Sequence, residues 1–213
     1  EGLLNKNGTT SATASTTFSL ASTEDWMTGS PAANNVADAA ATITVSNYAA
    51  PTITSATYDY NTNVLTVTGT NFVTQQGATN DVDLSTLTFT GEGGTTYTLT
   101  TATDIDITSD TSFTVTLSGA DLVNVESLLN KNGTTSATAS TTYNLAAADN
   151  WMLQSPAATN IADTTAGVTV SNYAVPTITS STYDFNTGTL VVTGTNLVGA
   201  AGANNDIVAN KFT

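Results

Sequence analysis

Residues 51–72 read PTITSATYDYNTNVLTVTGTNF. Thr, Val, Ile and Tyr, which are enriched in β-strands, fill Thr52–Tyr58 and Val64–Thr68. The intervening residues 59–63 are rich in Asp and Asn, whose side chains bond to the nearby backbone and favour turns. Gly69 closes the second run. This stretch therefore predicts two short strands joined by a turn.

The same pattern returns 125 positions later, where residues 176–197 read PTITSSTYDFNTGTLVVTGTNL. The offset holds elsewhere without an insertion or a deletion, relating Leu3–Thr10 to Leu128–Thr135, Trp26-Met27 to Trp151-Met152, and Ser46–Ala49 to Ser171–Ala174. Self-similarity at a fixed period indicates a tandem array of one structural unit. The duplication therefore defines the organisation of the chain.

Pro51 and Pro176 mark the expected unit starts, because Pro is tolerated at the first residue of a strand. Residues 1–50 are then the C-terminal part of a repeat module, 51–175 a complete module, and 176–213 the N-terminal part of the next. Two interpretations follow: either the array continues on both sides, or units exchange segments between chains. The sequence favours the first.

Further strands are expected within the complete unit. Leu87–Thr90 and Thr96–Thr100 flank a Gly-rich hairpin signal at 91–94. Asp104–Thr108 and Ser112–Leu117 alternate polar and apolar residues, which places one side-chain set inward. Later strands are expected at Thr142–Leu145 and Val168–Val170.

One short helix interrupts the strands. Ser118 and Asp121 have the spacing of a capping box, and Leu122, Val125 and Leu129 share one helical face. Gly133 offers a left-handed stop after the helix. About eight short strands around one helix predict an all-β fold of antiparallel β-sandwich modules.

Pro51–Thr54 followed by Val64–Phe72 resembles the opening of Ig-like modules of the IPT/TIG type, in which a Pro-led strand precedes a strand ending in a Gly-x-Asn-Phe-like turn. Pro176–Ser180 and Leu190–Leu197 repeat it, with Leu197 in place of Phe72. The composition also resembles tandem Ig-like repeats of very large secreted bacterial adhesins and surface-layer-like proteins. This resemblance implies an extracellular spacing role, with copies of itself or neighbouring repeats as partners.

The composition excludes several function classes. The net charge is −14, and the only cations are Lys6, Lys131 and Lys211, so clustered phosphate contacts to nucleic acid are not expected. The chain contains neither His nor Cys, which rules out Ser-His-Asp and Cys-His catalysis and the usual zinc sites. Paired carboxylates of the glycosidase type remain conceivable, yet no acid pair stands out. We therefore expect no enzyme, and no apolar run long enough for membrane insertion is present.

Calcium is the one candidate cofactor, because Ca²⁺ prefers carboxylate, amide and carbonyl oxygens. Acid and amide positions kept in both copies supply the candidate ligands, which are Asp59, Asn61, Asp81, Asp184, Asn186 and Asp206. Asp83, by contrast, corresponds to Val208, so it is not a ligand required in every copy. The competing interpretation is ordinary turn chemistry, in which Asp and Asn stabilise the loops themselves.

Trp26 and Trp151 have two interpretations: an exposed indole that stacks on a surface glycan, or a buried anchor of a long loop. The sequence favours the anchor. Together these features predict a structural extracellular repeat protein that forms an adhesin stalk, a surface coat, or a filament or sheath. The alternative is a carbohydrate- or calcium-dependent binding module of a surface adhesin.

Overall fold

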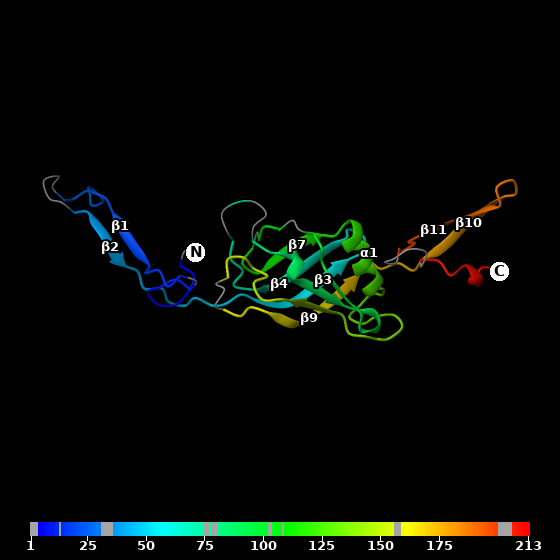
Figure 1. The fold of residues 1–213 in the computed structure, drawn as a ribbon, viewed down its shortest axis with the longest axis horizontal. Coiled ribbons are helices and arrows are strands. Elements are labelled where there is room, and N and C mark those ends of the chain that lie inside the picture. Colours follow the sequence, from blue (N-terminus) through cyan, green and yellow to red (C-terminus); the bar gives the residue numbers. More distant parts are fainter. Residues whose placement is uncertain are drawn as a thin grey trace.

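The computed structural model describes residues 4–12, 14–30, 36–74, 77, 81–101, 104–107, 109–155, 159–199 and 206–213. These residues form an elongated molecule in which a globular centre separates two projecting hairpins (Figure 1). The first hairpin is β1 (Ser19–Ser22) with β2 (Asp38–Thr42), and the last is β10 (Thr177–Asp184) with β11 (Thr189–Thr195). The centre holds the remaining strands and the only α-helix of the described ranges.

The central part is one seven-stranded sheet with the order β6-β5-β8-β9-β3-β4-β7. Its strands are β3 (Thr52–Asp59), β4 (Val64–Thr70), β5 (Leu87–Thr90), β6 (Thr96–Thr98), β7 (Ser112–Thr116), β8 (Asn144–Ala147) and β9 (Asp163–Ser171). Short 3-10 turns occupy Leu84–Thr86, Glu92–Gly94 and Ala209–Lys211. The prediction of a mainly β chain with one short helix is confirmed.

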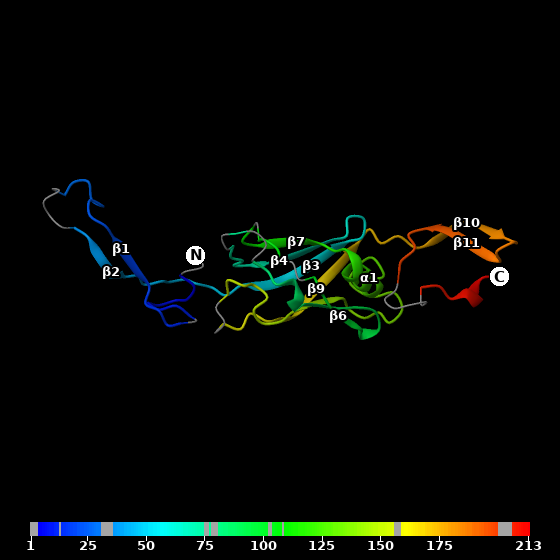
Figure 2. The same cartoon turned by 45° about the horizontal axis from the view of Figure 1, so that its top comes forward.

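The pairing of β3 with β9 is parallel, whereas every other strand pair in the described sheets is antiparallel. The expectation of a wholly antiparallel arrangement was therefore wrong at this pair. β3 is the first strand of the central part and β9 is its last strand, and the two lie side by side in the same direction. Figure 2 shows β3 and β9 next to each other, with α1 at one end.

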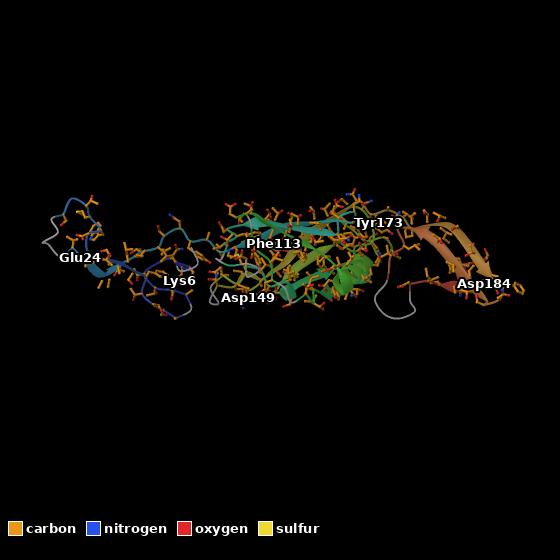
Figure 3. All side chains as sticks on the ribbon, turned by 90° about the horizontal axis from the view of Figure 1, so that it is seen from above. Lys6, Glu24, Phe113, Asp149, Tyr173 and Asp184 are labelled. Atoms are coloured by element: carbon orange, nitrogen blue, oxygen red, sulfur yellow. The ribbon has the colours of Figure 1, made fainter. Side chains whose placement is uncertain are left out.

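The sheet curls around a single core. Inward side chains of six strands belong to one buried cluster, including Tyr58, Leu65, Phe89, Phe113, Leu145 and Val168. A flat sheet could not bring the side chains of β5 and β7 into one cluster, so the curl closes the inner face. Figure 3 shows Phe113 within this central body. Full burial of one such apolar side chain stabilises the fold by about 1.5–3 kcal/mol.

A bulge in β3 sets which residues face the core. The register with β4 shifts between Ile53 and Ser55, so that Ile53, Ala56 and Tyr58 are buried while Ser55 is exposed. At the same place Gly69 lies against the opposite strand, where an added Cβ would approach the Thr52 carbonyl oxygen to 2.0 Å. The Gly that closes the predicted strand is therefore required by a close backbone approach.

The helix α1 spans Gly119–Leu128, close to the predicted position, and buries Val125 and Leu128. Two predicted details were wrong. Ser118 occupies the N-cap position but makes no side-chain cap bond, and the Asp121 carboxylate accepts from side chains and backbone at Tyr97, Thr100 and Thr101. Likewise Gly133 does not stop the helix: it lies beyond the C-cap Leu129 and bridges Val170.

The segment Asp104–Thr108 also differs from its prediction as a strand. Ile105 forms only an isolated bridge with Val82, while Ile107 is buried and Asp106 is exposed. Thr108 lies outside the described residues. Burial alternates only between Asp106 and Ile107, since Asp104 and Ile105 are both half-buried, and the described residues of this segment form bridges and no continuous ladder.

Candidate interaction surface

The predicted calcium ligands at the first turn stabilise the turn itself. Asp59 follows β3, and its carboxylate accepts from the Asn61 backbone N–H at 2.8 Å and from the Asn172 side-chain amide at 2.9 Å. The Asn172 bond lowers the pKa of Asp59 from its ordinary value, and the Asn61 bond acts in the same direction. Asp184 repeats the turn, because its carboxylate accepts from the N–H groups of Asn186 and Thr187 and its pKa is lowered.

The other two predicted ligands lie elsewhere. Asp81 is buried, and its carboxylate accepts from the Ile107 N–H at 2.7 Å. Its counterpart Asp206 is exposed near the C-terminal end. Within the described ranges, the structure gathers no group of three or more acidic residues in metal-binding geometry. Asp59 and Asn61 thus share one turn, Asp184 and Asn186 share its counterpart, and Asp81 bonds to the backbone at Ile107.

The two Trp loops have the same local geometry and different surroundings. The Trp151 indole N–H donates to the Ile161 carbonyl at 2.9 Å, and the Trp26 indole N–H donates to the Val36 carbonyl at 2.6 Å. Trp151 is nevertheless fully buried, whereas Trp26 is 56% exposed. The prediction of a buried anchor is thus confirmed for Trp151, which packs against Phe72 and Phe113, whereas the described residues leave the Trp26 indole exposed.

This contrast extends over the described parts of both terminal segments, 4–50 and 176–213. On the first, four exposed apolar residues, Leu4, Leu20, Trp26 and Met27, correspond to Leu129, Leu145, Trp151 and Met152, which are all fully buried. On the last, exposed Ile178, Tyr183, Leu190, Leu197, Ile207 and Phe212 correspond to buried Ile53, Tyr58, Leu65, Phe72, Val82 and Leu87. We call these two sets the first and the last open faces.

The two terminal hairpins have the same strand registers as their counterparts in the central sheet. The register of β10 with β11 repeats that of β3 with β4, including the bulge, as in the pairs Thr177↔Thr195 and Thr52↔Thr70. The register of β1 with β2 likewise repeats that of β8 with β9. Each hairpin therefore keeps its native pairing while its apolar side remains exposed.

In the central part, further contacts beyond the strand ladder join β3 to β9. Beyond the ladder, the Tyr60 N–H donates to the Ser171 carbonyl at 3.1 Å, and the Tyr60 ring meets Tyr173 edge-on at a centroid distance of 5.1 Å. Asn172 donates to Asp59 at the same corner. These contacts hold the last strand of the module against the first.

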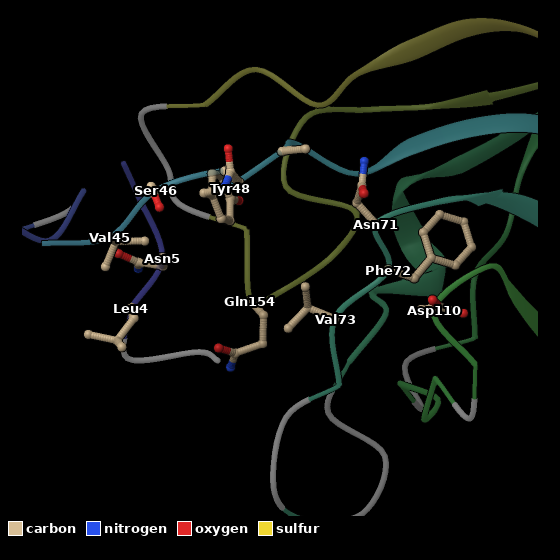
Figure 4. A pocket seen from close by; sticks show the side chains of 12 residues that line it. Leu4, Asn5, Val45, Ser46, Tyr48, Asn71, Phe72, Val73, Asp110 and Gln154 are labelled. Atoms are coloured by element: carbon tan, nitrogen blue, oxygen red, sulfur yellow. The ribbon is translucent and has the colours of Figure 1, made fainter. Parts of the chain in front are cut away.

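A pocket of about 550 Å³ lies where the first hairpin segment meets the central part (Figure 4). Residues 45–49 and Leu4 line one side, and Asn71, Phe72 and Val73 line the other. The Asn71 side-chain amide donates to the Ala50 carbonyl at 3.1 Å across this junction. The pocket is thus formed by the contact between successive repeats.

The side-chain amides of Asn132 and its counterpart Asn7 hold the backbone near the end of each repeat. Both amide atoms of Asn132 bond to the Tyr173 backbone at 2.8 Å, and Asn7 bonds to the Tyr48 backbone in the same way. Each pair fixes the chain as it leaves one repeat for the next.

Two acidic residues, Asp121 and Glu92, stabilise loops through contacts that the sequence analysis did not predict. Burial tends to raise the pKa of Asp121, but hydrogen bonds from Thr101 and Thr100 outweigh it and lower the pKa to about 2. Glu92 accepts from the N–H groups of Thr138 and Ala139 and from the Asn130 amide, which lowers its pKa to about 2. Their partners lie far along the chain, so no local motif could reveal them.

Comparison with known proteins gave no match: no family model, no curated protein and no solved structure is similar to this chain. In the described ranges, no helix has the length and apolar character needed to cross a membrane. The described residues form a mainly β structure with one α-helix.

Proposed function

We propose that this chain is a structural repeat protein of the cell exterior. Its tandem modules, of the Ig-like sandwich type, would form an adhesin stalk, a surface coat, or the wall of a filament or sheath. Contacts between modules and lateral β contacts would carry the function. The observation that supports this most directly is that the same hairpins form in both copies, each ending in a face that is buried only when a neighbouring segment covers it.

The shape supports the same proposal. The two hairpins project from opposite ends of the central part, so successive repeats extend the molecule along one axis (Figures 1 and 3). Repeat proteins in which each unit contacts mainly its neighbours gain length without new chemistry. The net charge of −14 favours solubility outside the contact faces.

The test is to locate the protein on the cells that make it. Immunogold electron microscopy with antibodies against the chain should label an external coat or appendage at repeated positions. Antibody absorbed beforehand with the pure chain is the control and should remove the label. Label confined to the cell interior would overturn the proposal.

The alternative is a binding module for surface glycans, and the exposed Trp26 indole favours it. Trp26 is more than half exposed and could stack on a sugar ring, whereas Trp151 is enclosed by Phe72 and Phe113. Titration of oligosaccharides against the chain and against a Trp26→Ala variant tests this function. Binding that is lost in the variant would support it, and equal signals would reject it.

A further inference from the structure

We propose that the central repeat carries a docking site for the linker that precedes it, and that Tyr48, seated in this site, fixes the orientation of the two repeats. The linker is residues 46–50 at the first junction and residues 171–175 at the second, where Tyr173 is the counterpart of Tyr48. This inference goes beyond the proposed function, because it concerns how neighbouring repeats are held and not where the protein acts. Linked modules usually move relative to each other, so a fixed junction needs specific contacts.

The docking site is built from two segments of the central part, residues 71–73 and residues 151–155. The first follows β4, and the second is the loop that the buried Trp151 anchors. The Phe72 ring packs against the Trp151 indole, and the backbone of the first segment also donates to the Met152 sulfur at 3.4 Å. The two segments are therefore held side by side by the core of the complete module.

The linker backbone bonds to both repeats. The Tyr48 N–H donates to the Asn7 side-chain oxygen at 2.8 Å, and the Asn7 amide donates back to the Tyr48 carbonyl at 3.0 Å, both within the preceding repeat. Two residues later, the Ala50 carbonyl accepts from the Asn71 amide of the central repeat at 3.1 Å. The next residue, Pro51, is buried, and its ring restricts φ. Hydrogen bonds from both sides thus fix the linker within three residues.

The Tyr48 side chain lies at the docking site. Tyr48, Val73 and Gln154 line the pocket at this junction (Figure 4). Burial raises the pKa of Tyr48 above its ordinary value, and the Ser155 hydroxyl beside it acts in the opposite direction. The phenol therefore lies next to a hydroxyl of the following repeat.

Ser155 gives an independent reason for a polar group at this position. It is 8% exposed, and its hydroxyl oxygen makes no hydrogen bond of ordinary geometry within the described ranges. A buried hydroxyl without a partner is unfavourable. Because hydroxyl hydrogens rotate freely, the neighbouring Tyr48 hydroxyl is placed to satisfy Ser155 when the linker is docked.

The second junction shows how the preceding repeat holds the same linker. The Tyr173 ring meets Tyr60 edge-on at a centroid distance of 5.1 Å, and both backbone groups of Tyr173 bond to Asn132 at 2.8 Å. The neighbouring Asn172 donates to Asp59 at 2.9 Å. Ring, backbone and side-chain contacts therefore tie the linker to the repeat it leaves.

The repeats also touch directly at the second junction. Gly199 lies beside α1, since an added Cβ would be 3.6 Å from Cγ1 of Val123. The same stretch carries Asn196 and Val198, the counterparts of two docking-site residues. The elements that hold the linker therefore recur at the next junction, where we expect the same fixed orientation.

Nuclear magnetic resonance of the whole chain tests this inference. Backbone order parameters of residues 46–50 should be about 0.85, the value of rigid backbone. Residual dipolar couplings from β1 and β2 and from the central sheet should fit a single alignment tensor. Nuclear Overhauser cross-peaks should join the Tyr48 ring protons to the Cβ protons of Ser155.

Tyr48→Ala removes the docked side chain and keeps the backbone. The order parameters of residues 46–50 should then fall below about 0.6, the range of flexible backbone, and the two sets of couplings should need separate tensors. Thr44→Ala, at an exposed position of the same segment, is the matched control and should retain the values of the natural chain. Unchanged amide signals from the central strands show that both variants fold.

Asn71→Gly tests the bond from the central repeat separately. Asn71 has a φ of 58°, which Gly adopts without strain, so this change removes the amide donor and keeps the local backbone. The order parameters of Ala49 and Ala50 should decrease, while the central strands remain unchanged.

Several results would overturn the proposal. Order parameters below about 0.6 for residues 46–50 of the natural chain, or two separate tensors, would show a hinge in place of a fixed junction. Missing cross-peaks to Ser155, or equal rigidity in Tyr48→Ala, would reject Tyr48 as the docked residue. Each of these outcomes is separate from the immunogold result, since a fixed junction is compatible with either location of the protein.

Discussion

The rings of Phe72 and Trp151 lie edge to face with their centroids 5.3 Å apart, and this contact closes one end of the central core. Phe113 lies against the same indole at 6.0 Å. Trp26 has the same loop and the same indole hydrogen bond but neither ring beside it. The molecule thus contains a buried and an exposed version of one residue, which makes several matched experiments available.

Trp151→Ala should lower the free energy of unfolding of the central part by about 3–5 kcal/mol, because it opens a cavity and removes two ring contacts. Trp26→Ala is the matched control and should leave that transition unchanged. Urea unfolding followed by circular dichroism measures both. Equal losses in the two variants would show that Trp26 is also enclosed by packing in solution.

Asp121→Asn should destabilise the protein by about 1–3 kcal/mol at neutral pH, since an amide nitrogen would face backbone and hydroxyl donors now bonded to carboxylate oxygens. Asp25→Asn is the control, because the second copy naturally carries Asn150 there with nearly the same backbone, φ of 64° against 61°. Chemical unfolding of both variants beside the natural chain checks this, and a neutral Asp121→Asn would contradict it.

The pH dependence follows from the same carboxylate. The pKa of Asp121 is about 2 in the folded chain, below its ordinary value of 3.8. A lowered pKa gives stability that is fully present above about pH 4 and is lost as the pH falls toward 2. Thermal melting across this window should show a smaller acid-induced decrease for Asp121→Asn than for the natural chain. Parallel curves would show that Asp121 does not contribute to acid unfolding.

Gly69→Ala should cost about 3 kcal/mol, because the new Cβ would overlap the Thr52 carbonyl and the Phe72 ring. Gly167→Ala is the control: nothing lies within 4 Å of its added Cβ, so stability should be unchanged or rise by about 0.5–1 kcal/mol. Thermal unfolding compares the two. Tolerance of Ala at position 69 would indicate that β3 and β4 can separate there without penalty.

Calcium and a chelator should leave the melting midpoint unchanged. The carboxylates of Asp59 and Asp184 already accept turn hydrogen bonds, which a cation would have to displace. Differential scanning calorimetry with added Ca²⁺, and then with excess chelator, measures the midpoint. A rise with Ca²⁺ that Asp59→Asn abolishes would instead support the metal interpretation of these residues.

Much of the fold could be predicted because its signals are local. The two strands around Asp59, the hairpin at 91–94 and the helix near Val125 follow from residue type, turn chemistry and periodicity. Asp104–Thr108 showed the same alternation but lacks a continuous partner strand. The role of Asp121 was misassigned for a related reason, since its donors at 97–101 lie a full strand away.

The sequence alone determined the 125-residue period, the turns and the pairs of strands that flank them, because each depends on residues close together in the chain or on direct repetition. The tertiary structure alone decided burial, as the pairs Trp26 and Trp151 or Tyr183 and Tyr58 show. It also decided the parallel pairing of β3 with β9. At the end of this pair, Asn172 donates a hydrogen bond to Asp59, which lies 113 positions earlier in the chain. Burial depends on which distant segments cover a side chain, so equivalent residues in the two copies can differ in exposure although their local sequences agree.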